Sequence, residues 1–99
     1  MIITGGENVY PREVEEVLYT RPEVLECVVV GLPDPEYGER VTAFIVPQKG
    51  RQIDPASLKD YLKTRLAAFK VPKEYITVEE LPKSSAGKVL KKEIRKRYS

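Results

Sequence analysis

The sequence predicts an α+β fold, in which about three helices pack on a small three-stranded sheet and a short β-hairpin stands at the N-terminus. A length of 99 residues fits a single small domain. Two β-branched runs, at 24–32 and 40–47, are typical of paired strands. Two other segments begin with proline and repeat apolar residues at helical spacing. No internal repeat or long linker divides the chain, so these elements are expected to share one core.

The first twenty residues predict a strand, a turn and a helix. Met1–Thr4 is apolar and leads into the turn signal Gly5-Gly6. Pro11 fits the first position of a helix over 11–20. The apolar residues of this helix recur at helical spacing and are Val14, Val17 and Leu18. Its acidic residues suit the positive end of the helix dipole, which explains them better than acid–base catalysis; they are Glu13, Glu15 and Glu16.

The middle of the sequence predicts a pair of strands and a second helix. A strand over Val24–Leu32 should end at the loop signal Pro33-Asp34-Pro35, and a strand over Arg40–Pro47 should pair with it. Asp54 is a good N-cap with Pro55 behind it. The apolar face of the helix that follows is formed by Leu58, Tyr61, Leu62 and Leu66.

The last quarter predicts a third strand and a third helix. Tyr75–Val78 reads as a strand, Leu81–Gly87 as a loop, and Leu90–Arg97 as a short basic helix. From Lys83 onward Glu93 is the only acidic residue, so this end of the chain is a local basic patch.

Composition excludes several classes of function. The sequence has no histidine, which removes Ser-His-Asp and Cys-His catalysis and argues against a zinc site, so we expect no metal ligands. The net charge is only +2, which gives no reason to expect nucleic acid. The single cysteine, Cys27, cannot form a disulfide framework and fits a small core residue in a reducing compartment. No segment resembles a membrane span or a signal peptide, so we expect a cytoplasmic protein with at most peripheral membrane association.

Four segments of the sequence, taken together, are specific enough to indicate a protein family. They are MIITGGENVYPREVE at 1–15, VGLPDPEYGE at 30–39, FKVPK at 69–73 and LPKSSAGKVLKK at 81–92. In order and spacing the whole chain resembles the small C-terminal domain of the adenylate-forming acyl-CoA synthetases, most closely the fatty or aromatic acyl-CoA ligases. The resemblance makes residues 1–99 a mobile lid. The large N-terminal domain, which in the family holds ATP and the carboxylic acid, is not part of this sequence.

Lys88 is the expected catalytic residue. It follows Gly87, whose lack of a side chain lets the backbone approach reacting groups closely. Joining a carboxylate to ATP brings anions together, and a cation about 4 Å from a developing charge is worth ~4 kcal/mol at an effective dielectric near 20. From composition alone a solvated lysine would be the better reading; the resemblance reverses this and implies that Lys88 acts in adenylation. Acylation of Lys88, by neutralising it, would then switch the enzyme off.

The turn at Gly5, Gly6, Glu7 and Asn8 is a candidate binding loop. A pair of glycines is by itself more often a turn than a site, and this one is no P-loop. The resemblance implies that the loop faces the active site in a second orientation of the domain, where the pantetheine arm of coenzyme A passes it.

Tyr37, Phe69 and Lys73 form the third candidate group. An aromatic ring beside a cation suits an adenine ring and its phosphates. The resemblance implies that these positions approach the nucleotide of coenzyme A. The sequence departs from some relatives at Val71, where they have a basic residue, which weakens the expected grip on phosphate. Phe69 could instead pack at the end of its helix.

The resemblance also implies a mechanism with two poses. One pose presents Lys88 for acyl-adenylate formation, and a large rotation then presents the glycine loop for thioester formation. The hinge in relatives lies just before the position of Met1. ATP, coenzyme A and a carboxylic acid, of which medium- or long-chain fatty acids fit best, are the expected substrates. Mg²⁺ is expected to be bound by the N-terminal domain, and the isolated chain is expected to be inactive.

Two other classes of function stay open at this point. One is a stand-alone interaction or regulatory domain derived from such a lid. The other is a small nucleic-acid module that uses the basic C-terminal helix, although the strands show no paired exposed aromatics for base stacking.

Overall fold

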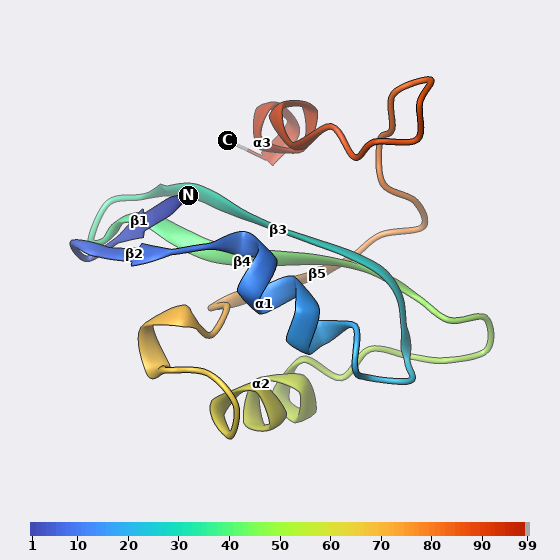
Figure 1. The fold of residues 1–99 in the computed structure, drawn as a ribbon, viewed down its shortest axis with the longest axis horizontal. Helices are drawn as coiled ribbons and strands as arrows, with labels where there is room; N and C mark the ends of the chain where they lie inside the picture. The colour runs from blue at the N-terminus through green and yellow to red at the C-terminus, as the bar shows by residue number, and fades with distance from the viewer. Residues whose placement is uncertain (99) are drawn as a thin grey trace.

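The computed structural model describes residues 1–98 and has the predicted α+β architecture (Figure 1). A two-stranded hairpin, β1 (Ile2–Thr4) and β2 (Glu7–Val9), opens the chain. The main sheet contains β3 (Val24–Asp34), β4 (Gly38–Pro47) and β5 (Glu74–Thr77), in the order β3-β4-β5. β3 and β4 are antiparallel, whereas β4 and β5 are parallel because α2 lies in the connection between them.

The helices lie on both faces of this sheet. α1 (Pro11–Leu18) and α2 (Pro55–Lys63) cover one face, and α3 (Lys91–Tyr98) covers the other (Figure 1). A short 3-10 helix, η1 (Ala68–Lys70), joins α2 to β5. Within residues 1–98 no helix has the length and apolar character that a bilayer span requires.

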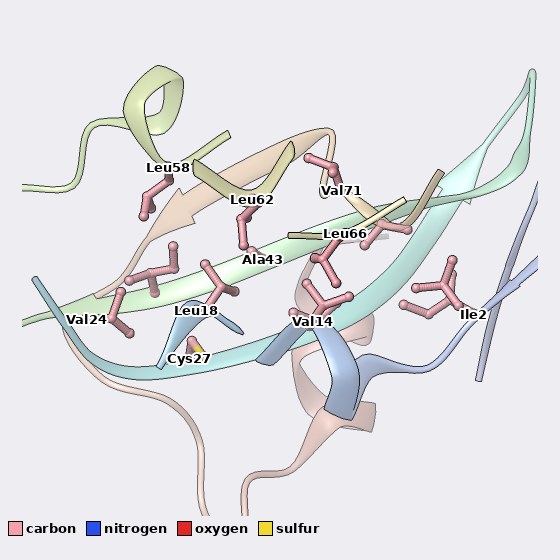
Figure 2. Close-up of a cluster of buried hydrophobic side chains, with 14 residues drawn as sticks. Ile2, Val14, Leu18, Val24, Cys27, Ala43, Leu58, Leu62, Leu66 and Val71 are labelled. Carbon is pink, nitrogen blue, oxygen red and sulfur yellow. The ribbon is translucent and has the colours of Figure 1, made fainter. Parts of the chain in front are cut away.

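Burial of both sheet faces explains the unbroken apolar runs of β3 and β4. Alternate residues of a strand point to opposite faces, so Cys27 and Val29 pack under the helices α1 and α2, whereas Val28 and Val30 face α3. The larger cluster joins the sheet to α1, α2 and the β1–β2 hairpin (Figure 2). Cys27 is buried in it, as predicted, and burial, followed by the charge of Glu15, raises the pKa of its thiol to about 12.

The boundaries of several elements differ from the sequence-based predictions. β3 continues to Asp34 because Pro33 pairs with Glu39 across the hairpin, so the proline does not end the strand. α2 ends at Lys63, and Leu66 contributes to the core from the segment behind it. α1 ends at Leu18 rather than at residue 20, and α3 begins at Lys91.

Candidate functional site

The first candidate region is a hollow at the turn of the β1–β2 hairpin. Its volume is about 210 Å³, and it is lined by Thr4, Gly5, Glu7, Tyr37, Phe69 and Lys73. The structure thus brings together members of two candidate groups of the sequence analysis, the glycine turn and the group Tyr37, Phe69 and Lys73. Gly6 belongs to the same turn, and Asn8 pairs with Ile3 in the hairpin, but neither lines the hollow.

Tyr37 is held against the glycine turn by the loop between β3 and β4. The Asp34 carboxylate accepts hydrogen bonds from the backbone N–H groups of Glu36 and Tyr37, both at 2.9 Å. The hydrogen bond from Tyr37, followed by the one from Glu36, holds the pKa of this carboxyl below its ordinary value. The Gly5 N–H then donates to the Tyr37 carbonyl at 2.9 Å. Gly5 has φ of +56°, and a Cβ there would lie 3.3 Å from the Tyr37 ring, so the turn favours glycine on both counts.

A lysine lies over the ring of Tyr37. The Lys73 ammonium is 3.3 Å from the ring centroid, within range of a cation–π interaction. Phe69 is 37% exposed and sits in η1, not at the end of α2, so it does not close that helix against the core. Lys70, beside it, forms an ion pair of 2.9 Å with Glu13, which ties η1 to α1. The hollow therefore combines aromatic surface, one cation and a side-chain-free turn.

Glu39 joins the β1–β2 hairpin to the main sheet, and sequence reasoning missed it. Its carboxylate accepts the Ile3 N–H at 2.9 Å. The space it occupies depends on Gly31, because a Cβ on Gly31 would lie 2.7 Å from a Glu39 carboxylate oxygen. No sequence pattern signals this contact, since Gly31 and Ile3 come from different strands.

Lys88 lies in a second region, at a small hairpin that follows β5. Lys83 and Val89 form an isolated antiparallel bridge, and the turn between them contains Gly87 with φ of +86°. Ser84 closes the turn: its N–H donates to the Lys88 carbonyl at 2.8 Å and its hydroxyl oxygen accepts the Lys88 N–H at 3.2 Å. The segment 81–87, predicted as a loop, lies outside any helix or strand, and the bridge and hydrogen bonds give it the shape of a small hairpin. The Lys88 side chain is exposed and, among residues 1–98, its ammonium has no ion-pair or hydrogen-bond partner.

Lys88 borders a different hollow from that of the glycine turn. This second hollow has a volume of about 490 Å³, and its polar lining includes Tyr10, Arg12, Glu15, Tyr19, Lys88 and Lys91. Met1 also lines it, whereas Gly5 lines the first hollow, so the two regions lie at the two ends of β1. At ~3.3 Å per residue along a strand, the four residue steps from Met1 to Gly5 span about 13 Å. The structure does not bring Lys88 and the glycine turn into one site.

Comparison with known proteins assigns this chain to a family. Residues 13–88 match the family model described as the AMP-binding enzyme C-terminal domain. The chain belongs to this family. The AMP-binding C-terminal domain is 50% identical over 98 residues to a feruloyl-CoA synthase from an Amycolatopsis species, a match that covers 99% of this chain and 20% of that protein.

Two further relatives agree with this assignment. A fatty acid–[acyl-carrier-protein] ligase, ScoC from Streptomyces coeruleorubidus, is 45% identical over 98% of this chain and 19% of its own length. A solved structure of a Mycobacterium tuberculosis fatty acyl CoA synthetase superposes with a TM-score of 0.94 and 43% identity, over all of this chain and 20% of that one. The AMP-binding C-terminal domain thus spans about a fifth of the length of these relatives.

The residues described hold no ready metal site. Between Met1 and Tyr98, no group of three or more acidic, cysteine or histidine side chains is placed to bind an ion.

Proposed function

We propose that this domain is the mobile C-terminal lid of an AMP-forming acyl-CoA synthetase. The enzyme would convert a carboxylic acid, ATP and coenzyme A into an acyl-CoA, AMP and pyrophosphate. Medium- or long-chain fatty acids fit best as the acid, in keeping with the fatty acyl CoA synthetase among the relatives. A partner domain N-terminal to this one would bind ATP, its Mg²⁺ and the acid, so the 99-residue chain alone would be inactive.

The observation that carries the proposal is the isolation of the Lys88 ammonium. It lies on an ordered hairpin in a lysine-rich segment, yet within the part of the chain that the structure describes it pairs with no acid. In the first half-reaction a carboxylate oxygen attacks the α-phosphorus of ATP and pyrophosphate leaves, so negative charge shifts between oxygens. An unpaired ammonium brought into a closing, drier cleft could contribute about 10²–10³ in rate, as other preorganised transition-state donors do.

In the second half-reaction a thiol attacks the acyl carbon and AMP leaves. We assign the hollow at Gly5, Tyr37 and Lys73 to the binding of coenzyme A. The turn at Gly5 leaves room for a narrow chain, and Tyr37, Phe69 and Lys73 offer aromatic faces and a cation for the nucleotide. We also include the neighbouring residues of the β1–β2 turn, Gly6, Glu7 and Asn8, in the coenzyme A site. Gly87 belongs to the turn that carries Lys88. Separate hollows at the two ends of β1 support a mechanism in which rotation of the domain presents one after the other.

The proposal includes a cytoplasmic location, where reducing conditions would keep the Cys27 thiol free. Membership of the AMP-binding family supports the enzyme over a nucleic-acid module or a stand-alone regulatory domain.

The decisive test separates the two half-reactions in an enzyme that carries this domain. Lys88→Ala should lower the rate of acyl-adenylate formation by about 10²–10³, measured by pyrophosphate exchange, and should leave thioester formation from supplied acyl-adenylate intact. Lys92→Ala is the matched control, because Lys92 is an exposed lysine of the same basic segment. Equal loss in both half-reactions would contradict the role of Lys88.

The acceptor thiol needs its own test, because one relative is a fatty acid–[acyl-carrier-protein] ligase. Lys73→Ala should raise the KM for coenzyme A without changing adenylation. If the KM for coenzyme A stays normal and the acyl group is transferred faster to an acyl carrier protein than to coenzyme A, the acceptor is the carrier protein and the assignment of coenzyme A is wrong.

A further inference from the structure

The hairpin that carries Lys88 is pinned at both of its ends by ion pairs. Lys83, at the start of the hairpin, pairs with Glu26 of β3. Lys91, the first residue of α3, pairs with Glu15 of α1 at 3.3 Å. The two lysines that flank Lys88 are thus paired with acids of other elements, one in the sheet and one in α1.

Glu15 is the better fixed of the two acids. Its side chain is 15% exposed, whereas that of Glu26 is 30% exposed. The same carboxylate oxygen that faces Lys91 accepts the Val29 N–H at 2.9 Å. The helix that bears it is anchored in the core by Val14 and Leu18, which are fully buried. Glu15 therefore presents a carboxylate whose place is set by β3 and α1 rather than by Lys91.

Apolar contacts alone do not orient the hairpin tip. Leu81 precedes the hairpin and Ile94 follows it, and both are buried against the sheet. Between them Val89, at the base of the tip, is half-buried and packs against the same cluster, whereas Ser85, Ala86, Gly87 and Lys88 are exposed. The hydrogen bonds of Ser84, Gly87 and Lys88 at the tip stay within the hairpin itself. The direction in which the tip points thus depends on where its two ends are held.

We propose that Glu15 is a positioning residue for Lys88. By holding Lys91 against α1, it fixes the C-terminal end of the hairpin and so directs the Lys88 ammonium to one place. The inference rests on the proposed function, in which Lys88 acts in adenylation. The helix dipole alone would explain Glu15 as a solvated charge at the start of α1. The proposal instead gives this acid a specific part in the adenylation half-reaction.

Glu15→Gln isolates the ion pair from the other role of this side chain. The glutamine oxygen can still accept the Val29 N–H, but the charge that holds Lys91 is gone. A misplacement of 1 Å can cost about 10² in rate, and the Lys83–Glu26 pair remains, so we expect the adenylation kcat to fall about 3- to 10-fold. The KM for ATP and the rate of thioester formation from supplied acyl-adenylate should not change.

Two further variants make the test specific. Lys91→Gln should reproduce the loss, and the double variant should lose no more than either single one, because both remove the same pair. Glu16→Gln is the matched control: Glu16 is the next residue of the same helix, and its recorded pair is with Arg12 within that helix. Its adenylation kcat should equal that of the unaltered enzyme.

A second readout does not depend on catalysis. In the 99-residue chain, the amides of Gly87 and Leu90 donate within the hairpin, to Ser84 and Pro82. Glu15→Gln should speed their hydrogen exchange at least about 3-fold relative to the Val46 amide of the core, whereas Glu16→Gln should not.

The outcomes separate the two proposals. Unchanged hairpin exchange and unchanged adenylation kcat in Glu15→Gln, in an enzyme that Lys88→Ala cripples, would overturn the positioning role and leave the proposed function standing. Loss of both half-reactions alike would also overturn it, because it would indicate general destabilisation. If Lys88→Ala leaves adenylation intact, the proposed function fails, and hairpin exchange alone then decides whether Glu15 orders this segment.

Discussion

Replacing Gly31 by alanine tests how the β1–β2 hairpin is attached to the sheet. The added Cβ would lie 2.7 Å from a Glu39 carboxylate oxygen and 2.9 Å from the Ile2 Cγ2 atom. Both distances are shorter than van der Waals contacts allow, and Ile2 is only 2% exposed, so it cannot move into solvent. Overpacking of this kind costs about 1–3 kcal/mol. Gly31→Ala should therefore lower the free energy of unfolding by that amount, measured by urea denaturation monitored by circular dichroism.

The double variant shows whether the clash with Glu39 is the cause. Glu39→Ala alone should destabilise slightly, because Ile3 loses the acceptor of its N–H. Gly31→Ala/Glu39→Ala should be less destabilised than the sum of the two single variants, because the carboxylate that meets the new methyl group is gone. A loss below about 0.5 kcal/mol for Gly31→Ala, or strict additivity, would refute the reasoning, since surface-like substitutions stay within that range.

Four further predictions concern stability and reactivity. The Tyr75 hydroxyl is buried and has no partner within residues 1–98, so Tyr75→Phe should raise the free energy of unfolding by about 0.5–2 kcal/mol. Tyr19→Phe, the matched control, should lower it by about 1 kcal/mol, because the Tyr19 hydroxyl accepts the Cys27 N–H at 3.1 Å. Cys27 should resist iodoacetamide at pH 8 until the chain unfolds, as mass spectrometry would show; rapid labelling of the native chain would contradict its burial. Its pKa rises from 9.0 to about 12 on folding, so the unfolded chain loses the proton first and stability should fall as the pH rises from about 9 to 12. Asp54→Ala should lower the free energy of unfolding by about 1 kcal/mol, measured by thermal melting, because the Asp54 carboxylate accepts the Ala56 N–H at 3.2 Å. An unchanged melting temperature would show that this cap does not stabilise α2.

The fold could be predicted from the sequence because its local signals agree with its packing. Pro11 and Pro55 both occupy the first turn of a helix, and Asp54 caps α2 as expected. The apolar runs of β3 and β4 are strands whose two faces are both buried. The predicted end of β3 at Leu32 was wrong. Pro33 pairs with Glu39 without needing an N–H group, and its carbonyl accepts a hydrogen bond from Arg40.

The sequence suggested candidate site residues but not how the fold arranges them. The glycine turn and the group Tyr37, Phe69 and Lys73 were chosen as two separate candidates, and only the folded chain shows that members of both line one hollow. Their meeting depends on the Asp34 turn and on Glu39, which act between strands. The isolation of the Lys88 ammonium was equally invisible, since it depends on which lysines of a basic segment find acids elsewhere.

The two faces of the sheet differ in how firmly they are covered, and the difference matters for the last twenty residues. On the α3 side, Leu81 and Ile94 are the buried apolar side chains between β5 and Tyr98. The Tyr98 ring adds an edge contact with Phe44, with the ring centroids 4.7 Å apart. Two such aliphatic side chains supply about 3–6 kcal/mol before the entropy of ordering that segment is subtracted. The C-terminal layer should therefore detach from the sheet at a modest free-energy cost while the other elements stay folded. A brief protease treatment under native conditions should cut first within residues 79–90 and leave a resistant fragment that ends near β5.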